Sequence, residues 1–310
     1  MKPILTALAV AAIGIAGPAF AEYPEKPVTF IVPWPPGDLE DILTRMIAED
    51  FQAEYGVAAA VVNKPGGGGG PFPGAIDVAT APADGYMIGS FVSDVPLVGH
   101  EIGIPELDGE IFEPIGVFLT YPFVIATMGN APYSTMEELA AHAQDNDVVL
   151  GHFGDVLTPT QVTKALSANM GFDWAADAAY DALDCNTLAS GDADVINTTL
   201  QLILPCIDQV NVLASITGDR ISLVPDTPAI GEVDPSLDIA LWNGLFVHED
   251  TPQDVRDKIA AIASQTVMSD RAQTLAAETG ALVYWVDAEA SAALIEADKA
   301  TLAEITAILE

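Results

Sequence analysis

Residues 28–48 read VTFIVPWPPGDLEDILTRMIA: an apolar, β-branched run, a proline-rich turn and a segment with apolar residues at helical spacing. This order predicts a buried strand that passes through a tight turn into a helix. In open α/β sheets, ligands bind where strands enter helices, and Gly37 lets the backbone approach a ligand closely. A helix N-terminus favours an anion, yet Asp38, Glu40 and Asp41 stand here. The stretch therefore predicts a ligand loop whose own acids compete with an anionic ligand.

Strand and helix patterns alternate along the rest of the chain, which favours a parallel α/β architecture. A second strand, loop and helix start follow one another in GHFGDVLTPTQ, residues 151–161. The two loops could face each other across a cleft and hold a carboxylate or phosphate through backbone N–H groups. Alternatively, both are ordinary turns in which Asp and Glu cap the following helix. Local chemistry leaves these two interpretations equally open.

Residues 1–21, MKPILTALAVAAIGIAGPAFA, carry one Lys near the start, an apolar middle and a small-residue ending. They predict a secretory signal peptide cleaved between Ala21 and Glu22, and hence a periplasmic location. A membrane anchor is the less favoured alternative, because the apolar core is interrupted and shorter than the roughly 20 residues that span a bilayer. With 10 basic against 45 acidic residues, the chain has a net charge of −35. Such a surface repels nucleic acid and anionic membranes, so we expect neither as a partner.

The sequence lacks the common motifs of catalysis and metal binding. It has no Gly-x-Ser-x-Gly elbow and no His-Glu-x-x-His pair, and Pro-Phe-Pro follows the glycines at 66–70 where a phosphate loop needs Lys. We therefore predict that the protein is not an enzyme and uses no cofactor and no metal. Of the four histidines, His152 alone follows a predicted strand and is a candidate site residue. Cys185 and Cys206 either form a disulfide or remain two buried free thiols.

The order of motifs along the chain resembles the periplasmic receptors of tripartite tricarboxylate transporters, the Bug-type family. Each motif is modest alone, but together they cover nearly the whole chain after residue 21 in the expected order. The stretches that carry the resemblance are YPEKPVTFIVPWPPGDLEDILTRMIA, VVNKPGGGGGPFPGAIDVATAPADGYMIG, FEPIGVF, YSTMEELAAHAQ, GHFGDVLTPTQ, LASGDADV, VPDTPAIGEV and WNGLFVHEDTPQDV.

This resemblance implies a Venus flytrap of the periplasmic-binding-protein type II kind, an α/β fold of two domains with a ligand cleft between them. Residues 22–121 with 243–310 would form one domain, and 122–242 the other. Family members bind small carboxylates, mostly through backbone N–H groups, hydroxyls and water, and deliver them to a membrane permease. The implied partners are a small-molecule ligand and the permease subunits of a tripartite tricarboxylate-type transporter, and the expected state is a monomer. A solute-sensing co-receptor for a membrane sensor kinase is the alternative.

The resemblance also implies ligand-binding positions, each carried over by its place in a motif. They lie on the loop after the first strand, near residue 90 of the same domain, on the second strand–loop–helix motif and at the next strand end. The implied residues are Trp34, Pro35, Pro36, Gly37, Asp38, Leu39, Asp41, Ser90, Phe91, Ser93, Asp94, Gly151, His152, Phe153, Gly154, Asp155, Thr158, Asn197 and Thr198.

Two of these loops depart from the family pattern. Small residues usually follow Gly37 in the first loop, and serines usually stand where this chain has His152 and Phe153. If Asp38 and Glu40 both face the cleft, a dicarboxylate is disfavoured, because two like charges about 4 Å apart cost roughly 4 kcal/mol at an effective dielectric near 20. An amine-bearing, aromatic or metal-chelated ligand would then suit the site better. We expect Asp38 to face the cleft and Glu40 to face solvent.

Overall fold

The opening strand and helix form where the sequence predicts them. In the computed structural model, which describes residues 22–66, 70–180 and 182–310, β1 spans Val28–Val32 and α1 spans Leu39–Tyr55. The predicted signal peptide and the middle of the glycine run lie outside the described residues. The structure therefore begins immediately before the stretch that predicts the ligand loop.

β1 is apolar except for Thr29, and helices cover both of its faces. Phe30 points to the α1 side and meets the Phe51 ring edge-on at 6.1 Å, whereas Ile31 packs with Phe72 of α2 (Phe72–Ala79) on the other side. A strand buried on both faces loses the polar–apolar alternation of a half-exposed strand. α1 ends at Gly56, whose φ of 69° lies in the left-handed region that glycine adopts without strain.

The first sheet has six strands in the order β11-β4-β10-β3-β1-β2. β1 pairs in parallel with β2 and β3, whereas β10 runs antiparallel to both β3 and β4. The sheet is therefore mixed rather than wholly parallel, because the chain returns to it in the opposite direction. The remaining strands are β2 (Ala59–Asn63), β3 (Met87–Val92), β4 (Phe112–Thr120), β10 (Trp242–His248) and β11 (Leu282–Asp287).

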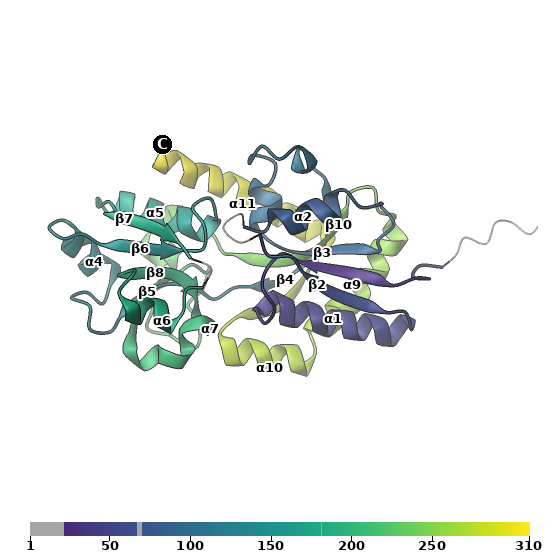
Figure 1. Cartoon of the computed structure of the whole chain (residues 1–310), viewed down its shortest axis with the longest axis horizontal. Helices are drawn as coiled ribbons and strands as arrows, with labels where there is room; N and C mark the ends of the chain where they lie inside the picture. The colour runs from purple at the N-terminus through teal and green to yellow at the C-terminus, as the bar shows by residue number, and fades with distance from the viewer. Residues whose placement is uncertain (1–21, 67–69, 181) are drawn as a thin grey trace, which may run out of the picture.

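The second sheet has five strands in the order β7-β6-β8-β5-β9 and lies beside the first (Figure 1). β6 pairs in parallel with β7 and β8, and β5 runs antiparallel to β8 and β9. Residues 121–122 carry the chain from the first sheet to the second, and residues 216–241 carry it back. The strands are β5 (Phe123–Met128), β6 (Val149–His152), β7 (Ala176–Ala179), β8 (Val195–Thr199) and β9 (Val210–Ser215).

Helices cover both sheets. One helix joins the half of the molecule built on the first sheet to the half built on the second. α11 packs on β4 and β11 and also contacts α5 of the second half, so the end of the chain spans both (Figure 1). The helices not yet given are α3 (Asp94–Val98), α4 (Met136–Ala143), α5 (Thr158–Asn169), α6 (Cys185–Ser190), α7 (Leu200–Ile203), α8 (Ile230–Val233), α9 (Gln253–Val267), α10 (Asp270–Thr279) and α11 (Ala288–Leu309), with 3-10 turns at Pro105–Leu107, Leu204–Gln209 and Pro235–Leu237.

A disulfide joins Cys185 at the start of α6 to Cys206 in the 3-10 turn after α7, with their Cα atoms 6.0 Å apart. It ties α6, which precedes β8, to the turn that follows α7, so the two linked segments flank β8 in the sequence. Over the described residues, none of the helices combines the length and apolarity that a membrane crossing requires.

Candidate functional site

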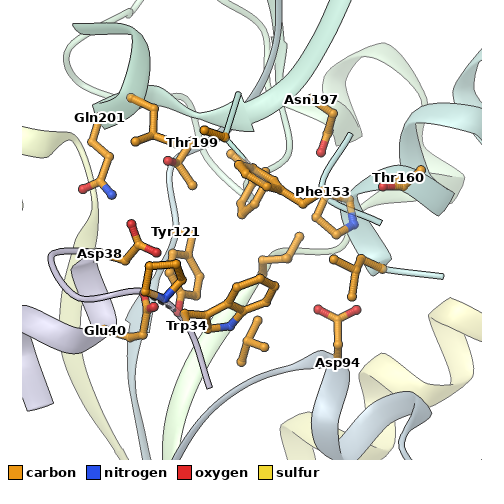
Figure 2. A pocket seen from close by; sticks show the side chains of 18 residues that line it. Trp34, Asp38, Glu40, Asp94, Tyr121, Phe153, Thr160, Asn197, Thr199 and Gln201 are labelled. Carbon is orange, nitrogen blue, oxygen red and sulfur yellow. Dashed lines mark hydrogen bonds between the residues drawn. The ribbon is translucent and has the colours of Figure 1, made fainter. Parts of the chain in front are cut away.

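A cavity of about 260 Å³ lies between the two halves, where the loops after β1 and β3 face the loops after β6 and β8 (Figure 2). The aromatic rings that line it are those of Trp34, Tyr121, Phe123 and Phe153. Among the described residues that line it there is no Lys, Arg or His. The charged groups that line it are the carboxyl groups of Asp38, Glu40 and Asp94.

Glu40 lies inside the cavity wall, which corrects the expectation that it faces solvent. Its side chain is only 2% exposed, and its carboxylate accepts a hydrogen bond of 3.0 Å from the Tyr121 hydroxyl. Asp38 lines the cavity as expected; it is half-buried, precedes the first residue of α1 and caps no backbone N–H. Tyr121 lies 81 residues away, on the segment that connects the two sheets. The sequence pattern of the helix around Glu40 could therefore not predict this contact.

Asp41 turns away from the cavity and holds the loop in place. Its carboxylate accepts hydrogen bonds from the Gly37 N–H at 2.9 Å, Arg45 Nε at 3.0 Å and Asn63 Nδ2 at 2.8 Å. Asn63, at the end of β2, also donates to the Trp34 carbonyl at 3.0 Å. Gly37 has a φ of 99°, a conformation that side chains with a Cβ resist. The turn is therefore fixed by glycine and by Asp41.

The neighbouring acids differ in protonation because their surroundings differ. Burial, reinforced by the nearby Asp38, raises the pKa of Glu40 to about 8, and burial with the nearby Asp41 raises the pKa of Asp38 to about 6. For Asp41, burial acts in the same direction, but the bonds from Arg45, Gly37 and Asn63 outweigh it and lower its pKa. The two acids that line the cavity therefore keep their protons to a higher pH than Asp41 does.

Asp94 bridges the two halves across the cavity. It is 1% exposed at the start of α3, and its Oδ1 accepts both the Thr158 N–H at 2.7 Å and the Thr158 hydroxyl at 2.9 Å. Burial raises the pKa of Asp94, while these bonds from Thr158 lower it in part. Thr158 is the first residue of α5, so the chain's own carboxylate occupies the N-terminus of this helix.

Asn197 and Thr199 line the opposite wall from β8. Asn197 Nδ2 donates to Thr163 Oγ1 at 2.9 Å, and that hydroxyl uses its own proton on the Pro159 carbonyl at 2.8 Å. The orientation of the Asn197 amide is therefore set, and its Oδ1 is directed at the cavity (Figure 2). Both Asn197 Oδ1 and Thr199 Oγ1 are buried atoms without a hydrogen-bond partner among the described residues. Buried polar atoms of this kind usually find a partner, which a bound ligand can supply.

The structure brings some of the sequence-predicted site residues together around the cavity and places others elsewhere. Those that line it are Trp34, Pro35, Asp38, Asp94, Phe153 and Asn197. Thr158 does not line the cavity but is hydrogen-bonded to Asp94, which does. Pro36 and Gly37 lie on the exposed side of the first loop. The others sit in the core or on the outer surface: Leu39, Asp41, Ser90, Phe91, Ser93, Gly151, His152, Gly154, Asp155 and Thr198.

Strand alternation explains several of these placements. Asn197 and Thr199 face the cavity from β8, whereas Thr198 between them donates to the Leu183 carbonyl on the other side. On β3, Phe91 stacks on Phe246 in the core, with ring centroids 5.8 Å apart. The period of two in β8 was a signal that could have identified Thr199. Tyr121 and Gln201 carried no such signal, and sequence reasoning missed both as lining residues.

His152 belongs to a separate polar cluster beside the cavity. Its Nε2 lies 2.8 Å from Asp177 Oδ1, and Asp155 lies close enough that the three side chains could hold a metal ion. However, the Lys164 ammonium contacts both Asp155 and Asp177, and a metal ion would have to displace it. We therefore assign the cluster a role in linking β6, β7 and α5.

Comparison with known proteins identifies the relatives of this chain. The family model described as "Tripartite tricarboxylate transporter family receptor" matches residues 43–309. Protein BugT of Bordetella pertussis is 27% identical over 237 residues, which are 72% of this chain and 71% of that protein. A UPF0065 protein encoded in the tcbD-tcbE intergenic region of a Pseudomonas species is 25% identical over 261 residues, 79% of this chain and 75% of its own.

Solved structures share the fold at lower sequence identity. The periplasmic binding protein BugD superposes with a TM-score of 0.77 at 24% identity, covering 91% of this chain and 97% of that one. Rhodopseudomonas palustris Rpa4515 with adipate gives a TM-score of 0.79 at 21% identity, covering 93% and 98%. MatC from the same organism, with bound malate, gives 0.76 at 20% identity, covering 93% and 100%. The two mixed sheets of this chain are thus the periplasmic-binding-protein fold of these structures.

Proposed function

Since this chain belongs to the tripartite tricarboxylate transporter receptor family, we propose that it captures a small organic solute outside the cytoplasm and delivers it to the permease of a tripartite tricarboxylate-type transporter. The family consists of binding proteins rather than enzymes. The observation that carries the proposal is the cavity, whose walls come from both halves of the molecule. A site built between two halves can open and close by their rotation, which is how such receptors take up and release a ligand.

The solute class follows from the relatives and from the donors that remain in the cavity. Two structural relatives hold adipate and malate, so a carboxylate on the solute is the starting proposal. The lining side chains that can donate to it are the hydroxyls of Thr160 and Thr199, the amide of Gln201 and the indole N–H of Trp34. The first three belong to the second half, so we place the carboxylate on that side, away from Asp38 and Glu40.

A periplasmic site of action is the further part of this proposal. The family is one of transporter receptors, and a structural relative with a TM-score of 0.80 is described as a periplasmic transporter. Export through the predicted signal peptide at 1–21 would place the cavity where solutes enter from outside. To test this step, a reporter is fused after residue 21 of the full chain, and cells that express it are fractionated. We expect the reporter in the periplasmic fraction.

Ligand-induced thermal shift tests capture. The purified protein is screened against carboxylates, amino acids and aromatic acids, and a hit is repeated with two matched variants. Ala182→Phe fills the cavity from an exposed lining position, whereas Ala189→Phe makes the same change at an exposed position outside it. We expect the shift to vanish in the first variant and persist in the second. No hit in the whole panel, or a hit that survives Ala182→Phe, contradicts capture in this cavity.

A further inference from the structure

The cavity presents an excess of negative charge toward its contents. Asp38, Glu40 and Asp94 line it, and the described lining residues include no basic side chain. Figure 2 shows Asp38 and Glu40 together at one end, with Asn197 and Phe153 on the opposite wall. A dianion that enters between these groups meets like charges in a partly desolvated site, where repulsion is stronger than in water.

Two backbone N–H groups of the facing loops are already bonded to carboxylates of the protein itself. The Gly37 N–H of the first loop donates to Asp41, and the Thr158 N–H at the start of α5 donates to Asp94. In each case the protein's own carboxylate stands where an anionic ligand would bind. On the side of the first loop, the Trp34 indole N–H is the side-chain donor that remains, among the described residues, for the second carboxylate of a dicarboxylate.

The cavity contains acceptor atoms without a hydrogen-bond partner in the described part of the chain, which favours a ligand that carries hydrogen-bond donors. Asn197 Oδ1 is a buried acceptor whose orientation is set by Thr163, and it has no partner among the described residues. The side chain of Asp38 caps no backbone N–H, although it stands at a helix start. An ammonium group carries three N–H donors and no acceptor, so it complements the acids at one end of the cavity, and Asn197 Oδ1 on the opposite wall can accept from a second donor of the solute. The rings of Trp34 and Tyr121 beside these acids add a face to which a cation is attracted.

We propose that the captured solute carries a protonated amine, which Asp38 and Glu40 bind at the Tyr121 end of the cavity. This inference rests on the proposed capture function and narrows its ligand class. The solute's body lies between Trp34 and Phe153, and any carboxylate on it points to the Thr199 and Gln201 side. An amino acid-like zwitterion or a small amine fits this arrangement, whereas a simple dicarboxylate does not.

Calorimetric titration with a charge-matched series tests the ligand class. The probes are adipate, 5-aminopentanoate and 1,4-diaminobutane, which share one butylene spacer and differ in the groups at its ends. We expect at least one of the two amines to bind about 10- to 100-fold more tightly than adipate, the factor that a charge-assisted hydrogen bond supplies. Adipate tighter than both amines, particularly with affinity that rises as the pH falls below about 6 and the acids become protonated, overturns the inference.

Substitutions of the two acids test where in the cavity the amine binds. Asp38→Asn and Glu40→Gln should each weaken amine binding about tenfold or more, whereas Glu54→Gln, an exposed acid on the same α1 helix, should leave it unchanged. Asp38 is half-buried with no capping bond, so its variant remains informative if Glu40→Gln folds poorly. Amine affinity that is equal in wild type and both variants overturns the inference.

The result also separates this inference from the capture function. If the series fails to bind but a panel metabolite binds, an amine on that metabolite supports the inference and its absence overturns it, while capture stands. If nothing in either set binds, capture itself fails, and the inference fails with it.

Discussion

The two walls of the cavity differ in charge and in how they are held. The wall from the first half is acidic, and an ion-pair network around Asp41, with Arg45 and Asn63, holds its loop. The wall from the second half is neutral, built of amide and hydroxyl groups, and the Cys185–Cys206 disulfide holds the segment behind it. A site made of one acidic and one neutral wall discriminates by which end of a solute faces which wall. Four measurements sharpen or break this comparison.

The largest expected effect is on the neutral wall. The double variant Cys185→Ser and Cys206→Ser removes a cross-link with a sequence separation of 21, and we expect it to lower the free energy of unfolding by about 3 kcal/mol. Urea unfolding under oxidising conditions measures this loss. A reductant should destabilise the wild type to the same degree and leave the variant unchanged. Equal stability of the two proteins without reductant would show that the second wall holds itself by packing alone.

The second largest effect is expected in the hydrogen-bond network around Asp41, on the acidic wall. Asp41→Asn replaces one of two acceptor oxygens by an NH2 group, which then faces either the Gly37 and Arg45 donors or the Asn63 Nδ2 donor, so we expect a loss of about 2 kcal/mol at pH 7. The pKa of Asp41 is lowered in the fold, because bonds from Arg45, Gly37 and Asn63 outweigh the effect of burial. Its contribution is therefore present above the ordinary value of 3.8 and disappears as the pH falls through the folded value. A loss that stays constant down to pH 2 contradicts this account.

Glu40, one position earlier, should behave in the opposite way. Burial, with Asp38 nearby, raises its pKa from 4.5 to about 8, so its ionisation opposes folding, and stability is lost as the pH rises from about 4.5 toward 8. Glu40→Gln should thus raise the free energy of unfolding near pH 8, where ionisation of Glu40 destabilises the wild type, and change it little at pH 4.5. Urea midpoints across this range, with Glu54→Gln as the control, measure the difference. Destabilisation by Glu40→Gln at pH 8 would mean that Glu40 contributes an ion pair.

The smallest effect concerns the contact between the walls. Thr158→Val removes the hydroxyl that donates to Asp94 and keeps the backbone N–H that donates to the same oxygen, so we expect a loss of about 1 kcal/mol. The ligand-free protein should also be more open, which small-angle scattering detects as a larger radius of gyration. Thr274→Val, whose hydroxyl bonds only within its own helix, should change neither quantity. An unchanged scattering curve for Thr158→Val would show that other contacts hold the halves closed.

Local sequence patterns predict the elements around these neighbouring acids but not the direction of each side chain. The strand, the turn at Gly37 and the helix that follows are local patterns, and their position could be predicted together with a ligand loop beside them. The facing loop at 151–161 could be predicted in the same way, because each motif depends on residues close in the chain. Which acid faces the cavity could not be predicted in this way. Glu40 is drawn inward by Tyr121 and Asp41 outward by Asn63, and both partners are distant in sequence.

Periodicity and turn chemistry act over a few residues, so the α/β fold, the order of its elements and the two loops that meet at the cavity could be predicted from the sequence. The charge and the hydrogen-bonding groups of the site depend on the tertiary structure. It joined Asp94 to Thr158, turned Asn197 Oδ1 toward the cavity and buried Glu40. Each of these depends on a partner brought close by the folding of the whole chain. Local patterns carry no information about such a partner.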